Sequence, residues 1–121
     1  MAESLRVMNT SRGTLLAGQA RLANSFWRRL VGLLDRSRLE PGEALWIEPC
    51  NSVHMWFMRF PIDVVFISQQ GYVVSVVPHL PQWSFTWPQR GADTALELPV
   101  GTIAATRTEP GDRIVKEAAC A

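Results

Sequence analysis

Cysteine is scarce in this sequence, which contains only Cys50 and Cys120. Two cysteines without a CxxC spacing exclude a zinc ribbon, a dithiol redox motif and a disulfide framework. We therefore expect both thiols to be free, as in a protein of a reducing compartment. A metal site built from Cys50, His54 and His79 is not expected either, because ligands four positions apart on a strand lie about 13 Å from each other.

The sequence also lacks an excess of one charge, a phosphate-binding loop and a long apolar run. Lysine and arginine number 12 against 11 aspartate and glutamate residues, which argues against a nucleic-acid-binding face. No glycine-rich phosphate loop is present, and no cofactor is expected. No run approaches the ~18 apolar residues of a membrane span. No secretory signal is visible, so we expect a cytoplasmic protein unless a leader was removed.

Short periodic segments separated by turn residues predict a mainly β protein. We expect about eight short strands in a β-sandwich or small barrel-like fold, with one α-helix packed against it. The predicted strands include residues 5–9, 14–22, 44–47, 62–67, 72–77, 95–100, 102–107 and 112–117. Helical spacing predicts the helix from Asn24 or Ser25 to residues 35–37. The 121 residues suit a single domain, with a frayed end at residues 118–121.

The densest apolar run, Cys50 to Ile67, is predicted to form the core. Read with a period of two, both sides of residues 52–59 are largely apolar, which favours a strand covered on both faces. Pro61 has no N–H to contribute to a sheet, so it is expected to divide the run in two. Asp63 then stands alone among apolar neighbours, where a buried carboxylate needs a partner.

The same run carries the order His54, two residues, Phe57-Met58-Arg59, two residues, Ile62-Asp63. With residues 29–34, 96–101 and 111–112, it resembles the bacterial and archaeal family called domain of unknown function 192, and we expect a bacterial protein. The resemblance spans about residues 20–115, nearly the whole chain, with Met55-Trp56 as a mild departure. It implies a compact, mostly β, sandwich-like domain and supplies no reaction.

His54, Asp63 and Glu97 are the candidate acid–base residues, because each lies in a predicted strand between apolar neighbours. A histidine oriented by a carboxylate can act as a general base, although no recognisable nucleophile motif accompanies it. The alternative is a structural network that fixes the strand register. Arg59 is expected to form a buried ion pair with Asp63, Glu97 or Asp112.

The chain contains five tryptophans, and two of them lie in a proline-containing loop within residues 78–94. Trp83, Phe85 and Trp87 share one side of this extended segment. Rigid rings on a loop suit stacking against a sugar, a base or an apolar patch of a partner. The alternative is a flap that folds the rings back over one end of the sandwich. The tryptophans predicted to lie in the core are Trp27, Trp46 and Trp56.

These features predict a non-enzymatic binding module for an unidentified small molecule or protein. The predicted ligand-binding residues are His54, Arg59, Asp63, Glu97, Trp83 and Trp87. The alternative is a hydrolase-like enzyme that uses His54 as base, with Asp63 or Glu97 as acid or orienting group. Nucleic acid, membrane and metal are not expected as partners.

Overall fold

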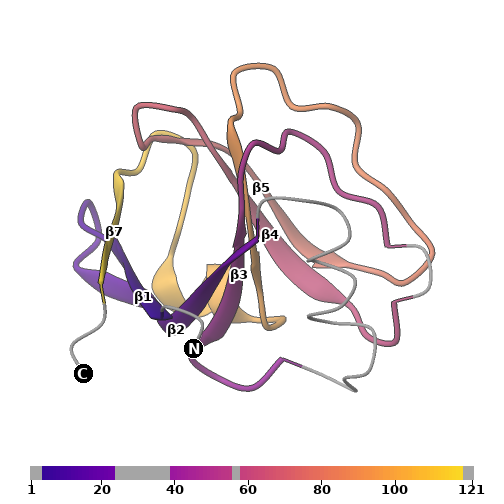
Figure 1. Cartoon of the computed structure of the whole chain (residues 1–121), viewed down its shortest axis with the longest axis horizontal. Helices are drawn as coiled ribbons and strands as arrows, with labels where there is room; N and C mark the ends of the chain where they lie inside the picture. Colours follow the sequence, from indigo (N-terminus) through magenta and orange to yellow (C-terminus); the bar gives the residue numbers. More distant parts are fainter. Residues whose placement is uncertain (1–3, 24–38, 56–57, 119–121) are drawn as a thin grey trace.

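The computed structural model describes residues 4–23, 39–55 and 58–118. This part of the chain contains seven strands and one short helix (Figure 1). The strands are β1 (Ser4–Asn9), β2 (Thr14–Ala23), β3 (Glu43–Ile47), β4 (Ile62–Ile67), β5 (Val73–Leu80), β6 (Thr94–Leu98) and β7 (Ile114–Ala118), and the helix is α2 (Thr102–Thr106). All seven belong to one sheet in the order β5-β4-β6-β3-β2-β1-β7. The prediction of a mainly β fold is confirmed.

Antiparallel hairpins form where the sequence places turn residues. Residues 10–13 connect β1 to β2, and residues 68–72 connect β4 to β5. Ser68 closes the second turn, because its N–H donates to Tyr72 O at 2.8 Å and its hydroxyl accepts from the Tyr72 N–H at 3.1 Å. β2 and β3 pair in parallel instead, which requires a longer connection than a hairpin turn.

The sheet curls until its two outer strands meet at one end. An isolated antiparallel bridge between Tyr72 and Arg113 joins the start of β5 to the start of β7. The Ile114 N–H also donates to Gly71 O at 2.8 Å. Gly71 is required here, because it has a φ of 94° and a Cβ would lie 3.2 Å from the Ile114 carbonyl oxygen. Beyond this contact the described parts of β5 and β7 do not pair, so the sheet stays open.

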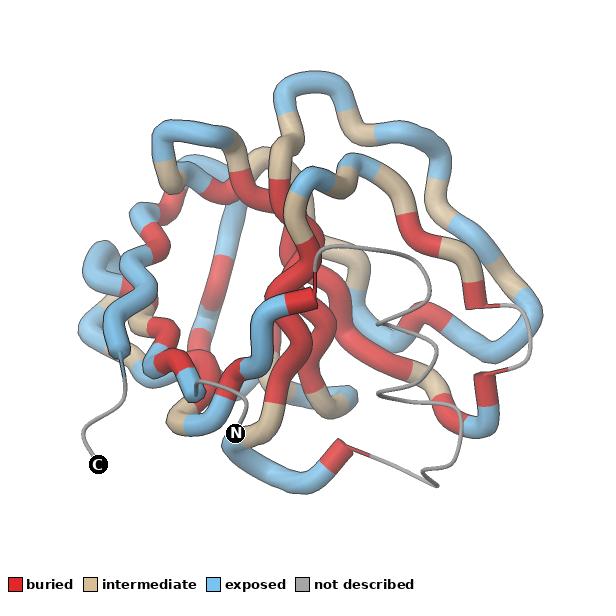
Figure 2. Tube along the Cα trace, viewed as in Figure 1, coloured by how far each residue is buried: buried red, intermediate tan, exposed pale blue. Residues whose placement is uncertain are grey.

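The central strands are largely buried (Figure 2), and two clusters of apolar side chains pack against them. Every residue of β4 is buried, so this strand is enclosed on both sides. The inner core fills the concave side of the curl and consists of Leu5, Val7, Leu16, Ala17, Ala20, Ala44, Trp46, Val65, Ile67, Val73, Leu96, Leu98, Ile103 and Ile114. The outer core consists of Ala23, Leu39, Leu45, Ile47, Val53, Met55, Met58, Phe60, Ile62, Val64, Phe66, Leu80 and Ala95. Trp46 is buried as predicted, whereas Trp27 and Trp56 lie outside the described residues.

The outer core is covered by two segments that we call the arm, residues 50–55 and 83–89. They run side by side and are joined by several backbone hydrogen bonds, such as that from the Thr86 N–H to Val53 O at 2.8 Å. Met55, with no exposed surface, packs from the arm into the outer core. The arm is therefore attached to the sheet by its apolar underside and stiffened by its own hydrogen bonds.

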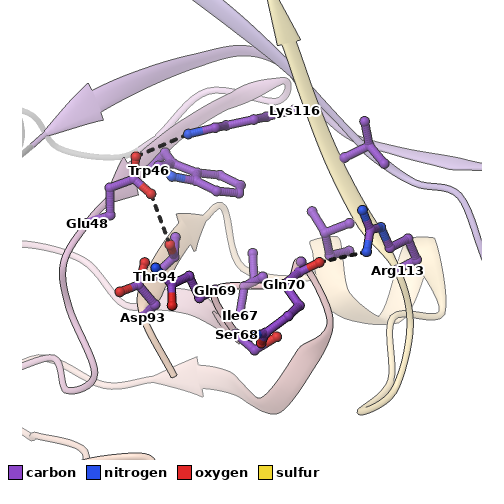
Figure 3. Close-up of a pocket in the computed structure, with 13 residues that line it drawn as sticks. Trp46, Glu48, Ile67, Ser68, Gln69, Gln70, Asp93, Thr94, Arg113 and Lys116 are labelled. Carbon is purple, nitrogen blue, oxygen red and sulfur yellow. Dashed lines mark hydrogen bonds and ion pairs between the residues drawn. The ribbon is translucent and has the colours of Figure 1, made fainter. Parts of the chain in front are cut away.

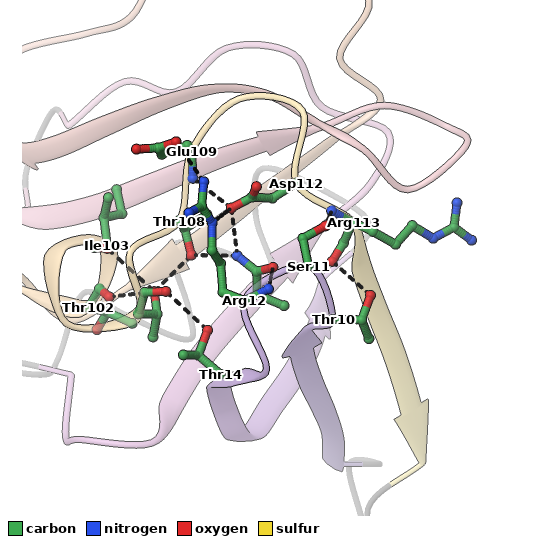
Figure 4. A network of polar contacts seen from close by, with 12 residues as sticks. Thr10, Ser11, Arg12, Thr14, Thr102, Ile103, Thr108, Glu109, Asp112 and Arg113 are labelled. Carbon is green, nitrogen blue, oxygen red and sulfur yellow. Dashed lines mark hydrogen bonds and ion pairs between the residues drawn. The ribbon is translucent and has the colours of Figure 1, made fainter.

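A buried polar network fixes the chain between α2 and β7 (Figure 4). Asp112 Oδ2 accepts hydrogen bonds from Asn9 Nδ2 at 3.0 Å, Arg12 Nε at 3.1 Å and the Glu109 N–H at 2.9 Å. Asn9 also donates to the Thr108 hydroxyl at 3.1 Å. Burial opposes ionisation of Asp112, but the bonds from Asn9, Glu109 and Arg12 outweigh it and hold the pKa of this carboxyl below its ordinary value.

Two predictions about local structure are wrong. Residues 102–107 contain helix α2 rather than a strand, so no hairpin surrounds residues 109–111. The described part of the run 52–58 forms no strand apart from an isolated bridge at His54. The helix expected from Asn24 or Ser25 to residues 35–37 lies outside the described residues. The sequence left open a β-sandwich and a small barrel-like fold. The described strands form one curled sheet that does not close into a barrel.

Candidate functional site

Asp63 has a structural role that explains a carboxylate within an apolar strand. It is 1% exposed and accepts three backbone N–H groups: Oδ1 from His79 at 2.9 Å, and Oδ2 from Gly101 at 3.1 Å and Ile103 at 2.9 Å. Backbone donors thus satisfy the buried charge and attach α2 to β4. The predicted buried ion pair of Arg59 is wrong, since Arg59 is exposed and its guanidinium pairs with no acid in the described residues.

Asp63 and Glu97 point to opposite faces of the sheet. In the register of β4 and β6, Asp63 lies opposite Leu98, and Val64 lies opposite Glu97. Cross-strand partners project from the same face, and consecutive residues alternate. Leu98 belongs to the inner core and Val64 to the outer core. Asp63 therefore faces inward, and only Glu97 faces the side on which the arm lies.

His54 lies on the arm, at the border between the outer core and the surface. It is half-buried, its backbone forms the isolated bridge with Phe85, and its neighbours Val53 and Met55 belong to the outer core. Glu97 has no exposed surface. The structure therefore places His54 and Glu97 on the same side of the sheet and Asp63 on the other.

Three aromatic rings project from the arm into solvent. The exposed fractions are 64% for Trp83, 53% for Phe85 and 74% for Trp87. The rings of Phe85 and Trp87 meet edge to face, with centroids 5.1 Å apart and an angle of 82° between planes. The interpretation of a flap folded over the end of the sheet is wrong. The rings form an exposed aromatic surface, defined by Trp83, Phe85 and Trp87.

The backbone near this surface adopts two left-handed conformations that are unusual for residues with side chains. His79 has a φ of 51° and Trp83 a φ of 63°, and each such conformation costs roughly 1–2 kcal/mol. Both are held by hydrogen bonds, from the His79 N–H to Asp63 and from the Trp83 N–H to Met55 O at 2.9 Å. The turn that presents Trp83 is thus fixed by the sheet and by the other segment of the arm.

Two arginines lie close in the sequence to the arm. In the sequence, residues 49–62 and 78–92 contain no aspartate or glutamate, but they contain Arg59 and Arg90. Both arginines are exposed. The exposed rings of the arm are therefore flanked in the sequence by two exposed arginines, and Glu48 and Asp93 stand just outside these segments.

A pocket of about 430 Å³ lies at the end of the sheet where β5 and β7 meet (Figure 3). The end of β3, the turn at residues 68–71, the start of β6 and β7 line it, and none of the predicted ligand-binding residues does. Its charged side chains are Glu48, Asp93, Arg113 and Lys116. Sequence reasoning missed these residues, because they come from separate segments and share no motif.

Glu48 is held in its ionised form within this pocket. Its carboxylate accepts from Lys116 Nζ at 3.1 Å and from the Thr94 hydroxyl at 3.3 Å. Partial burial raises the pKa of Glu48, but its attraction to the Trp46 indole, to Lys116 and to Thr94 outweighs burial, so the pKa lies below its ordinary value. The Lys116 ammonium also lies 4.8 Å from the centroid of the Trp46 ring, a cation–π contact.

The described part of the chain comprises residues 4–23, 39–55 and 58–118. These ranges contain no group of three or more histidine, cysteine, aspartate or glutamate residues arranged to hold a metal ion. No helix within them has the length and apolar character needed to cross a membrane.

Relatives of the chain come from Thermococcus and Pyrococcus species. A UPF0127 protein of Thermococcus sibiricus is 32% identical over 113 residues, covering 89% of this chain and 72% of the relative. A UPF0127 protein of Pyrococcus furiosus is 34% identical over 114 residues, covering 89% and 95%. Both organisms are archaea, which contradicts the expectation of a bacterial protein.

Two crystal structures share the fold, and a family model matches most of the sequence. One, described as a "putative transcription regulator" of Sinorhizobium meliloti, has a TM-score of 0.76 and 25% identity, covering 98% of this chain and 95% of that one. A protein of unknown function from Novosphingobium aromaticivorans has a TM-score of 0.75 and 22% identity, covering 93% and 83%. The family model DUF192, "Uncharacterized ACR", matches residues 7–116. The chain therefore belongs to the DUF192 family, as its central run predicted.

Proposed function

We propose that this protein is a non-enzymatic binding module that docks a protein partner on its exposed aromatic surface. The observation that carries the proposal is the exposure of Trp83, Phe85 and Trp87, each more than half accessible on an arm whose backbone is fixed. Exposed apolar patches mark interaction sites, and tryptophan is enriched among the residues that dominate binding energy. A fixed backbone also lowers the entropy lost on binding.

The two arginines near the arm suggest the chemistry of the partner. Arg59 and Arg90 lie in segments without an acidic residue, so a complementary surface has an apolar centre and an acidic rim. His54, beside the outer core, is suited to contact that rim. In this proposal Glu97 lies buried on the arm's side of the sheet, whereas Asp63 faces the other side and supports the site only by fixing the backbone of His79.

A protein partner suits this surface better than a small molecule or nucleic acid. Small-molecule sites are usually concave and enclose most of the ligand, whereas these rings project outward. Single-stranded nucleic acid can stack on aromatic rings, and the description of the Sinorhizobium meliloti structure makes it the competing ligand. Two arginines and a net charge of +1 supply little attraction for a phosphate backbone, however.

The hydrolase alternative gains no support from the acidic residues. Both oxygens of Asp63 bind backbone N–H groups, and Asp63 faces away from His54 and the arm. A site with His54 as base could draw only on Glu97 among the two carboxylates. General base catalysis also requires a reacting group within hydrogen-bond reach of the base.

A displayed library of random peptides tests the proposal, with the purified protein as bait. We expect enriched peptides to combine an apolar residue with aspartate or glutamate, and to bind in fluorescence polarisation. The Trp83→Ala/Trp87→Ala variant should weaken binding at least about tenfold. The matched control is Tyr72→Ala, which removes an exposed ring outside the arm and should leave affinity unchanged.

Charge is tested separately. Arg59→Gln/Arg90→Gln should weaken peptide binding and reduce its dependence on salt, whereas Arg6→Gln should not. Peptides that bind the double tryptophan variant as well as the unmodified protein would overturn the proposed surface. Binding of an oligothymidylate that is lost in the same variant, with no peptide enriched, would replace the protein partner by nucleic acid.

A further inference from the structure

We propose that the pocket at the end of the sheet where β5 and β7 meet binds a small zwitterion, a molecule with one ammonium and one carboxylate group. Its volume of about 430 Å³ lies within the range of small-molecule sites, roughly 300–1,000 Å³. The proposal does not depend on the function proposed for the arm, because no residue of the arm lines this pocket.

The charges of the pocket separate into a neutralised pair and two opposed groups. Lys116 and Glu48 neutralise each other, with Nζ 3.1 Å from Oε1. The remaining charged side chains of the lining are Asp93 and Arg113. Figure 3 shows Asp93 on the same side of the pocket as Glu48, and Arg113 on the opposite side. The pocket is therefore neutral overall but has charges of opposite sign on facing walls.

Asp93 is positioned by its backbone and leaves its carboxylate for a ligand. Its N–H donates to Ile67 O at 2.9 Å, and its carbonyl accepts from the Cys50 N–H at 2.8 Å. Its side chain forms no hydrogen bond or ion pair with any residue in the described ranges. A carboxylate held in this way at the edge of a pocket suits an ammonium group.

Arg113 is anchored by neutral groups, so its charge is not compensated. Its Nη1 donates to the Gln70 carbonyl oxygen at 2.6 Å, and its guanidinium lies 5.0 Å from the centroid of the Tyr72 ring. These contacts orient the side chain while its other N–H groups can still donate. A guanidinium oriented in this way suits a ligand carboxylate.

The rest of the lining excludes other ligand classes. A sugar would need an open aromatic face, but Lys116 Nζ covers the Trp46 ring at 4.8 Å. A ligand with a single charge would pair with one wall and leave the other charged group partly desolvated. Exposed Gln69 and Gln70 line the space between the walls, and their amides can hydrogen-bond to a polar linker. A small zwitterion needs no aromatic face, pairs with both charged walls and has a polar linker for the two amides.

NMR titration of the ¹⁵N-labelled protein tests the proposal. The probes are three zwitterions of increasing charge separation, glycine, γ-aminobutyrate and ε-aminohexanoate, and two molecules with one charge, n-butylamine and butyrate. We expect at least one zwitterion to give saturable shifts of the amides of residues 68–71, 93–94 and 113–116. Its affinity should exceed that of both single-charge probes by about tenfold or more.

Two substitutions connect the binding to the opposed charges. Asp93→Asn and Arg113→Gln should each weaken binding of that zwitterion about tenfold or more. The matched controls are Glu117→Gln and Arg6→Gln, which make the same chemical changes at exposed cross-strand partners on β7 and β1, outside the pocket. The amide spectrum of each variant also shows whether it is folded.

Three results would overturn the proposal. The first is the absence of saturable shifts with every zwitterion at millimolar concentration. The second is equal affinity for n-butylamine or butyrate, which would show that one wall alone binds. The third is unchanged affinity in folded Asp93→Asn and Arg113→Gln. Each result is independent of whether peptides bind the aromatic surface.

Discussion

The backbone N–H of Ile103, in the first turn of α2, donates a 2.9 Å hydrogen bond to the buried carboxylate of Asp63 in β4. The same carboxylate accepts from Gly101 and His79, so three donors depend on one side chain. A helix of five residues is too short to be stable alone. The position of α2 against the inner face of the sheet therefore depends on Asp63.

We expect Asp63→Asn to lower the free energy of unfolding by about 2–4 kcal/mol, because an amide NH₂ group would replace one accepting oxygen and face buried donors. Urea denaturation measures the change. The control is Asp93→Asn, whose carboxylate bonds no described residue and whose replacement should cost less than about 0.5 kcal/mol. Equal losses in the two variants would contradict the role assigned to Asp63.

Asp112 predicts a specific dependence of stability on pH. Its pKa in the folded protein is lowered from 3.8, so its contribution is complete above that value and is lost as the pH falls through the folded pKa. Asp112→Asn should reduce the free energy of unfolding at pH 7 by about 1–3 kcal/mol. It should also flatten the decline in stability below about pH 4. Urea unfolding of both proteins across a pH series measures this decline. An equal decline in Asp112→Asn and the unmodified protein would contradict the role of the network.

Alanine substitutions on the buried and the exposed side of the arm should have different effects on stability, large on the first and small on the second. Met55 has no exposed surface and packs in the outer core, so Met55→Ala should cost about 2–5 kcal/mol. Trp87 is 74% exposed, and Trp87→Ala should change the free energy of unfolding by less than about 0.5 kcal/mol. A large loss of stability in Trp87→Ala would show that the ring is structural rather than available for a partner.

Lys116 should control the ionisation of Glu48. Removing the ammonium in Lys116→Met takes away one of the contacts that hold the pKa of Glu48 low, so this pKa should rise. Because both side chains are about one-third exposed, the loss of stability should stay below about 1 kcal/mol. NMR titration of the Glu48 carboxyl carbon measures the pKa. An unchanged pKa would assign the shift to Trp46 and Thr94 instead.

Arg59 tests whether the buried ion pair expected from sequence exists. The side chain is exposed, so Arg59→Met should alter the free energy of unfolding by less than about 0.5 kcal/mol. Thermal denaturation would detect the larger loss, above about 2 kcal/mol, that removal of a buried partner produces. Such a loss would show that the guanidinium has a structural contact after all.

The sequence predicted the strands well where apolar runs end at turn residues. β4 and β5 follow from the run 62–67, the turn at residues 68–71 and the β-branched residues after it. The run 50–58 was misread, because apolar composition reports burial and not hydrogen bonding to a neighbouring strand. Residues 102–107 were misread because the Asp63 contact that fixes α2 comes from forty positions earlier in the chain.

The candidate sites were less predictable than the fold. The exposed aromatic surface could be identified, since Trp83, Phe85 and Trp87 alternate within one loop. The opposite orientation of Asp63 and Glu97 could not, because it depends on the register of β4 and β6. The pocket of Asp93 and Arg113 arises only when the curled sheet brings the turn at residues 68–71 beside β7.

The place of β1 in the sheet has a consequence for folding during protein synthesis. β1 lies between β2 and β7, and Leu5 is opposite Ala118. The β1–β2 hairpin can form early, but the other edge of β1 stays unpaired until residues 114–118 have left the ribosome. Such an edge is open to pairing with other nascent chains. Completion of the sheet must therefore follow translation of β7, and long-range contacts of this kind make folding slow compared with helical proteins of similar size.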